Sequence, residues 1–195
     1  MPRIVVMISG NGSNLQALID NQQEKGYKIV LVVSNKAEAY GLQRAEKAGI
    51  ERMVLPSKGR KREEFDKELA QKIKEKVVKI DLVVLAGWMR VLTSEFLKEF
   101  EERVVNLHPS LPGQFEGVNA IGRAYEAYQK GEVTETGVMV HIVTEEVDRG
   151  RLIEIGKIDF KQGESIEEFE QRVHETEWRV IVDGVCKELN RRGFL

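Results

Sequence analysis

The chain has 195 residues, a length typical of a single domain, and 42% of them are hydrophobic, which supports a substantial core. Its 30 basic and 32 acidic residues give a formal charge of −2, so no nucleic acid or other polyanion is expected as a partner. A single cysteine, Cys186, excludes an internal disulfide, and the apolar run at the N-terminus is too short for a signal peptide or membrane span. We therefore expect a cytoplasmic protein that does not contact membranes.

In the first half of the chain, short β-branched runs alternate with longer helical patterns. Four near-continuous apolar runs, at residues 4–8, 29–33, 82–86 and 104–107, are typical of strands buried on both faces of a parallel sheet. Helical patterns lie between them at residues 13–23, 37–48 and 62–75. This order predicts an α/β fold with a Rossmann-like, mostly parallel sheet and helices on both faces.

The pattern changes after His108, where prolines and glycines mark a long loop. A helix is expected at residues 122–130, followed by strands at residues 136–143 and 152–160. The acidic loop between these strands predicts a hairpin-like, antiparallel extension of the sheet. The chain ends in a long helix that starts with a capping box of Ser165 and Glu168. We expect one domain.

A polar, glycine-containing turn at residues 9–14 follows the first strand and opens the first helix. A helix N-terminus offers unpaired backbone N–H groups and a favourable dipole to an anion. Gly12 lets a ligand approach the backbone, and Ser13 and Asn14 add side-chain donors. The turn therefore predicts a phosphate site. The competing interpretation is a tight strand-to-helix turn capped by Ser13.

A dinucleotide fits this turn less well than a phosphate monoester. Leu15 occupies the place of the third glycine of the dinucleotide motif. The second strand ends in Ser34-Asn35-Lys36, without the acidic residue that would bind a ribose. We therefore expect a phosphorylated small molecule rather than NAD.

Asn106 and His108 form the predicted chemical centre, at the carboxyl end of a central strand where open α/β sheets place their ligands. Residues two apart on a strand point the same way, so both side chains would face one cleft. An amide beside an imidazolium is a donor pair suited to an oxyanion. Asp148, in a later loop, could hold the imidazole and is expected to raise its pKa.

Each of these residues also has a structural interpretation. His108 could be a strand-end residue that binds a loop carbonyl, and Asp148 could be an ordinary turn aspartate. His141 lies within a strand pattern, and we expect it to be structural. The scattered histidines form no metal-binding motif, so no metal is expected.

Several separated motifs, taken together, resemble phosphoribosylglycinamide formyltransferase, the folate-dependent enzyme of purine biosynthesis. They are residues 4–14, 34–36, 85–90 and 106–109, and Asp148 with Gly150. The resemblance covers essentially the whole chain. It implies one formyltransferase domain over residues 1–195, with a phosphate-binding, Rossmann-like half (1–105) and a catalytic and folate-binding half (106–195).

The resemblance also implies roles for individual residues. The residues that would bind 5'-phosphoribosylglycinamide are Asn11, Gly12, Ser13, Asn14, His174 and Glu177. Those that would bind the cosubstrate 10-formyltetrahydrofolate are Arg62, Met89, Arg90, Val91, Leu92, Asn106 and Val143. Without the resemblance, Arg62 would be interpreted as a solvated helix start and Met89 as a core residue.

Direct transfer is the mechanism that the resemblance implies. The substrate amine would attack the formyl carbon, while Asn106 and protonated His108 stabilise the oxyanion. Asp148 would orient His108 and help to move a proton from the amine towards the folate nitrogen. The expected partners are the two small molecules, and the chain is expected to be a monomer or a homodimer.

Two departures from the family pattern are present. The loop at residues 111–117 differs from the common bacterial form, and Arg149 and Arg151 flank Gly150 where Gly and Pro are frequent. The alternative functions are a formyltetrahydrofolate hydrolase, another formyl-folate transferase such as the methionyl-tRNA enzyme, or a non-catalytic phosphate-binding module. The phosphate turn favours the ribonucleotide substrate over the two other formyl-folate enzymes. A non-catalytic module would instead leave Asn106, His108 and Asp148 far apart.

Overall fold

The computed structural model describes all 195 residues and contains one seven-stranded sheet with the order β3-β2-β1-β4-β5-β6-β7. The strands are β1 (Arg3–Ile8), β2 (Lys28–Ser34), β3 (Arg52–Val54), β4 (Leu82–Leu85), β5 (Val104–His108), β6 (Glu135–Ile142) and β7 (Leu152–Asp159). Strands β1 to β5 pair in parallel, whereas β6 is antiparallel to both β5 and β7. This arrangement confirms the predicted fold class.

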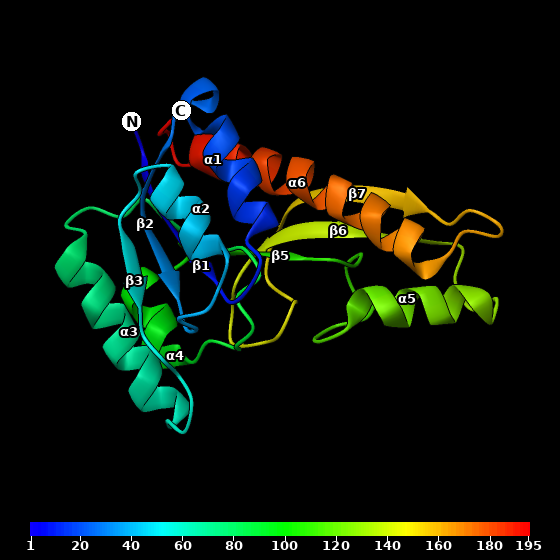
Figure 1. Cartoon of the computed structure of the whole chain (residues 1–195), viewed down its shortest axis with the longest axis horizontal. Helices are drawn as coiled ribbons and strands as arrows, with labels where there is room; N and C mark the ends of the chain where they lie inside the picture. The colour runs from blue at the N-terminus through cyan, green and yellow to red at the C-terminus, as the bar shows by residue number, and fades with distance from the viewer.

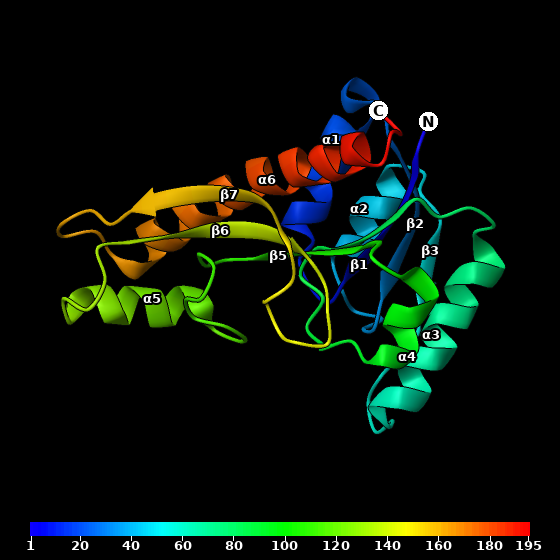
Figure 2. The same ribbon diagram turned by 180° about the vertical axis from the view of Figure 1, so that it is seen from behind.

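Helices surround the sheet (Figures 1 and 2). They are α1 (Ser13–Lys25), α2 (Gly41–Lys47), α3 (Arg62–Lys76), α4 (Ser94–Leu97), the 3-10 helix η1 (Lys98–Phe100), α5 (Ala120–Gln129) and α6 (Ile166–Arg191). Both views show α6 beside α1, and the two chain termini at the same end of the molecule. None of the helices combines the length and the apolar character that a membrane crossing requires.

Alternating strand residues divide the core between the two faces of the sheet. In β1, Ile4, Val6 and Ile8 pack with α1, α2 and α6. Val5 and Met7 pack on the other face with α3 and α4. Because successive side chains of a strand point to opposite faces, both sets must be apolar when both faces are covered. This explains the uninterrupted apolar runs in the sequence.

Short elements depart from the sequence-based prediction. Helix α2 begins at Gly41 instead of Ala37, because a turn precedes it in which the Ala39 N–H donates to the Lys36 carbonyl at 3.3 Å. Strand β3, helix α4 and η1 are not predicted, since elements of three or four residues carry too little periodicity. The long C-terminal helix is confirmed, and its capping box forms as expected.

Strand pairing determines which side chains face the same cleft. Parallel strands β4 and β5 bring their carboxyl ends to one edge of the sheet. Antiparallel β6 runs the opposite way, so that His141 lies opposite Asn106 and Met139 lies opposite His108. Directly opposed residues share a face of the sheet. His141 therefore points to the side where Asn106 and His108 lie.

Candidate active site

A cleft of about 280 Å³ lies at the carboxyl ends of β4 and β5. Three parts of the chain line it: the β4–α4 connection, the end of β5 with the loop that follows, and the end of β6 with the β6–β7 loop. Figures 1 and 2 show the β6–β7 loop, in yellow, beside β5. Apolar walls with a few convergent polar groups are typical of a small-molecule site.

Asn106, His108 and Asp148 converge in this cleft. His108 Nε2 lies 3.5 Å from Asp148 Oδ2, and the Asn106 side-chain amide donates to Asp148 Oδ1 at 3.5 Å. The side chains of His108 and Asp148 are both 7% exposed. The fold thus brings together three residues that lie on β5 and on the β6–β7 loop, as the sequence predicts.

His141 is a fourth polar side chain at this centre, and no sequence motif assigns it to the site. Its Nε2 lies 3.3 Å from Asn106 Nδ2 and 3.4 Å from Asp148 Oδ1. Its Nδ1 lies 2.9 Å from the Ile142 carbonyl, which can only accept, so Nδ1 carries a proton. Only the pairing of β5 with β6 places His141 here, and no periodicity in the sequence carries that information.

Contacts with strand β6 and with the loop between β5 and α5 hold the Asp148 carboxylate in its ionised form. Burial acts to raise the pKa of Asp148, but the contact with His141 and the hydrogen bond from the Gly117 N–H outweigh it, so the pKa is lowered. That N–H donates to Oδ2 at 2.9 Å. The backbone of Asp148 has a φ of 55°, in the left-handed region that few residues adopt.

His108 corrects one expectation. Its Nε2–H donates to the Phe115 carbonyl at 3.0 Å, a shorter contact than that with Asp148. Burial lowers the pKa of His108, and although Asp148 and the Phe115 carbonyl raise it, the net direction is downward. The expected net rise is therefore wrong, because the loss of hydration destabilises the charged imidazolium more than the neighbouring carboxylate stabilises it.

The residues expected to bind the folate lie mostly in this cleft. Those that line it are Met89, Arg90, Val91, Leu92, Asn106 and Val143. Arg62 does not line it, but its Nη2 donates to the Val91 carbonyl at 3.2 Å. Met89 is 70% exposed, so its interpretation as a core residue is wrong. The Arg90 guanidinium lies over the Phe65 ring, 4.6 Å from its centroid, and its Nε and Nη2 are buried without a hydrogen-bond partner.

The predicted phosphate turn adjoins the cleft wall. Gly12 is the N-cap of α1 with a φ of 76°, and no side chain caps the helix, so the interpretation of Ser13 as a capping residue is wrong. The start of α1 therefore presents backbone donors that an anion can bind. Ser9, which precedes the turn, accepts the Met89 N–H on its Oγ at 2.9 Å and joins the turn to the cleft.

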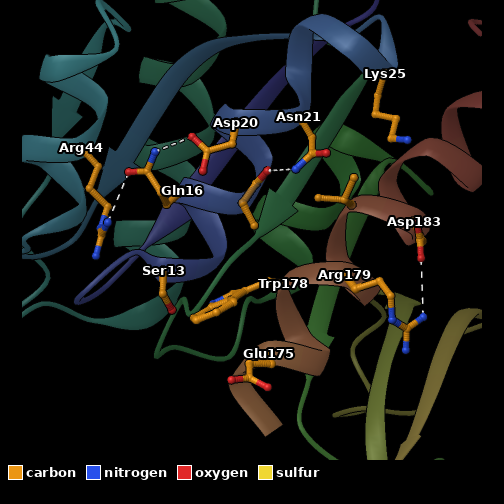
Figure 3. A pocket seen from close by; sticks show the side chains of 12 residues that line it. Ser13, Gln16, Asp20, Asn21, Lys25, Arg44, Glu175, Trp178, Arg179 and Asp183 are labelled. Atoms are coloured by element: carbon orange, nitrogen blue, oxygen red, sulfur yellow. Dashed lines mark hydrogen bonds and ion pairs between the residues drawn. The ribbon is translucent and has the colours of Figure 1, made fainter. Parts of the chain in front are cut away.

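A larger cavity of about 730 Å³ lies between α1 and α6 and is lined in part by Ser13 of the turn (Figure 3). Figure 3 shows Ser13 beside Trp178 in this cavity. Arg44 also lines it and supports the turn, because its Nε and Nη2 donate to the backbone and side-chain oxygens of Asn11 at 2.9 Å. None of the residues of the predicted chemical centre lies in this cavity.

His174 and Glu177, both expected near the substrate, line neither cavity. They face each other on one turn of α6, with His174 Nδ1 2.8 Å from Glu177 Oε2. This hydrogen bond raises the pKa of His174. Glu177 is buried, whereas the His174 side chain is 43% exposed. The same turn of α6 contributes Glu175 and Trp178 to the cavity beside Ser13.

Known proteins resemble the chain over nearly its full length. The sequence pattern of the "Formyl transferase" family matches residues 2–185. The phosphoribosylglycinamide formyltransferase of Dictyostelium discoideum is 41% identical, over 93% of this chain and 95% of its own. That of Schizosaccharomyces pombe is 44% identical, over 93% of this chain and 94% of its own.

Solved structures show the same similarity in three dimensions. Glycinamide ribonucleotide transformylase 1 from Symbiobacterium toebii superimposes with a TM-score of 0.88 at 35% identity, covering 99% of this chain and 89% of its own. The phosphoribosylglycinamide formyltransferase of Campylobacter jejuni gives a TM-score of 0.87 at 39% identity, covering 96% of this chain and 97% of its own.

Proposed function

The chain belongs to the formyl transferase family and, within it, to the phosphoribosylglycinamide formyltransferases, and on this basis we propose a reaction for its cleft. The enzyme transfers the formyl group of 10-formyltetrahydrofolate to the amine of 5'-phosphoribosylglycinamide, a step of purine biosynthesis. The observation that supports this proposal best is the convergence of Asn106, His108 and Asp148 in a cleft joined to a helix N-terminus without a side-chain cap.

Asn106 and His108 stabilise the negative charge that develops during transfer. When the amine nitrogen bonds to the formyl carbon, the carbonyl oxygen becomes an oxyanion, and the Asn106 amide offers an N–H donor to it. His108 offers a second donor only as the imidazolium, because the Nε2–H of the neutral ring already donates to the Phe115 carbonyl. Loss of one such donor typically costs about 3 kcal/mol of transition-state stabilisation. The same negative charge favours the imidazolium form of His108, which compensates for the effect of burial.

Asp148 lies within 3.5 Å of both donors and is ionised, so it can orient them and accept a proton from the attacking amine. Collapse of the tetrahedral intermediate then breaks the bond between the formyl carbon and the folate nitrogen, which takes up the proton that Asp148 accepted, so that the carboxylate is regenerated. The charges balance without a covalent enzyme intermediate.

The two substrates occupy adjoining parts of the molecule in this proposal. The folate lies along Met89 to Leu92, which line the cleft. The phosphate lies at Gly12 to Asn14, and Glu177 with His174 acts from α6 on the glycinamide side. We further propose that residues 1–195 act as one domain, divided at residue 105 into a phosphate-binding and a catalytic half, in the cytoplasm.

An assay with and without the ribonucleotide tests this proposal. Purified protein is mixed with 10-formyltetrahydrofolate, and both tetrahydrofolate release and formylation of the amine are measured. We expect folate release only when 5'-phosphoribosylglycinamide is present, and loss of both signals in the Asn106→Ala variant. Equal release with and without the ribonucleotide would move the assignment to a hydrolase.

A further inference from the structure

An ion pair joins the two loops that border the catalytic cleft. Arg149, on the β6–β7 loop, directs Nε to Glu116 Oε1 at 3.0 Å and Nη2 to Oε2 at 3.5 Å. Glu116 belongs to the loop between β5 and α5. Val147 from the first loop and Val118 from the second line the cleft. The pair therefore spans the cleft border and connects segments that are 33 residues apart in the chain.

The residues next to this pair contact the chemical centre directly. Gly117, which follows Glu116, donates its N–H to Asp148, which precedes Arg149. Phe115, which precedes Glu116, accepts the His108 Nε2–H on its carbonyl. The side-chain pair thus lies one residue away from the contacts that orient both the carboxylate and the imidazole.

Local backbone preferences do not hold these loops in place. Phe115 has a φ of 41° and Asp148 a φ of 55°, both in the left-handed region that residues other than glycine rarely adopt. Such residues keep this conformation only when surrounding contacts enforce it. On one side, Arg123 of α5 donates to the carbonyls of Phe115 and Glu116. The bidentate pair with Arg149 supplies the side-chain link to the other loop.

We propose that the Glu116–Arg149 pair is a positioning clasp that holds Asp148 against Gly117 and His108 for formyl transfer. This inference rests on the proposed function. Arg149 stands where glycine is frequent in the family pattern, and glycine has no side chain to form such a pair. The Arg149 side chain is 62% exposed, and exposed ion pairs contribute little to global stability. Its effect is expected on catalysis, not on folding.

Conservative variants of the two partners test the clasp. Arg149→Met and Glu116→Gln each remove one charge at nearly constant size, and Arg149→Lys keeps the charge. Lys157→Met is the matched control, because Lys157 forms a similarly exposed pair with Glu135 at 3.0 Å, at the far end of β6. For each variant, kcat, the KM for the ribonucleotide and the melting temperature are measured.

We expect Arg149→Met and Glu116→Gln each to lower kcat by about fivefold, because small displacements of catalytic groups are costly. The double variant should show the same loss, since the second change removes nothing more. Arg149→Lys should retain most of kcat. The KM for the ribonucleotide and the melting temperature should match those of the control. The clasp would be overturned if kcat were unchanged in both single variants. It would also be overturned if the fold loss of kcat in the double variant equalled the product of the two single losses.

A titration of His108 by NMR gives a readout that needs no substrate. Loosening Asp148 removes an influence that raises the pKa of His108, so His108 of Arg149→Met should titrate at lower pH than in the unaltered chain. In Lys157→Met it should titrate as in the unaltered chain. Identical titration of His108 in all three proteins would refute the clasp. If the unaltered chain formylates no ribonucleotide, but the pKa of His108 is still lower in Arg149→Met, only the proposed function is refuted and the clasp stands.

Discussion

At the scale of single residues, His108 experiences opposing influences within a few ångströms. Burial favours the neutral imidazole, and the charges of His141 and Arg123 act in the same direction. The Asp148 carboxylate and the Phe115 carbonyl favour the imidazolium. The net result is a lowered pKa in the free enzyme. Protonation of His108 therefore depends on how closely Asp148 is held and on the charge that develops on the substrate.

Replacing Asp148 by Asn is expected to lower the pKa of His108 further, because the nearest anion is lost while the size is kept. Oxyanion stabilisation requires the protonated form, so kcat should decline as pH rises through that pKa, and the decline should begin at lower pH in the variant. At any pH well above the pKa, a pKa that is lower by one leaves about tenfold less of the protonated imidazole. NMR titration of the histidines, together with kcat against pH, measures both effects.

His174 serves as the internal control in this titration. Its pKa is raised by Glu177 on α6, and it does not line the cleft. It should therefore titrate identically in both proteins. If His108 also titrates identically, Asp148 is not its electrostatic partner, and the roles within the centre must be reassigned.

At the scale of elements, the start of α1 depends on a close approach between two glycines. A Cβ on Gly12 would lie 2.7 Å from the Gly41 Cα, at the beginning of α2. The Gly41 N–H also donates to the Gly10 carbonyl at 3.1 Å. Backbone crowding thus explains why glycine is present at both positions. The turn that is proposed to hold phosphate is fixed by the packing of α2 against it.

Comparing the stability of the Gly12→Ala and Gly26→Ala variants separates the cost of backbone crowding from the cost of a left-handed backbone. Both glycines have a φ of 76°, but a Cβ on Gly26 would meet only the Leu195 side chain at 3.4 Å. We expect Gly26→Ala to cost about 1 kcal/mol from the left-handed conformation alone. Gly12→Ala should cost roughly 2 kcal/mol more, because the contacted atom is backbone and cannot rotate away. Urea unfolding measures the difference, and equal losses would contradict the crowding argument.

Sequence patterns predict the elements that are long enough to show a regular series of apolar residues or a recognisable cap. The apolar runs of β1 and β2 and the capping box of α6 are local signals, and each predicts the right element. The pairing of β5 with β6 is not local, so the position of His141 beside Asn106 could not be predicted. The direction in which the pKa of His108 moves is equally inaccessible from sequence, because burial at a strand end depends on how the loops fold over it.

At the scale of the whole molecule, α6 connects distant parts of the fold. Its final turns carry Glu188, whose side chain is fully buried and accepts hydrogen bonds from Arg151, Arg191 and Arg192. Arg151 follows Gly150, and its carbonyl accepts the Ile142 N–H at 2.9 Å, which closes the base of the β6–β7 loop. Glu188 therefore anchors the loop that carries Asp148 to the end of the C-terminal helix.

Replacing Glu188 by Gln should destabilise the fold at neutral pH by about 2–3 kcal/mol, less than for a fully buried pair, because the arginines reach solvent. Burial acts to raise the pKa of Glu188, but the hydrogen bonds from Arg191 and Arg151 outweigh it and lower the pKa to about 2. A carboxylate whose pKa is lower in the folded than in the unfolded state contributes its full stability above the unfolded value. That contribution is lost as pH falls towards the folded value.

The difference in unfolding free energy between the unaltered chain and Glu188→Gln should therefore be largest near pH 7. It should shrink as pH falls below the ordinary glutamate pKa of about 4.3. Glu135→Gln is the matched control, because its exposed pair with Lys157 should change stability by less than about 1 kcal/mol at any pH. Urea unfolding at pH 7, 5 and 3 measures these differences. A Glu188→Gln difference that stayed constant over this range would show that the carboxylate charge does not anchor the loop, and that only side-chain packing at this position matters.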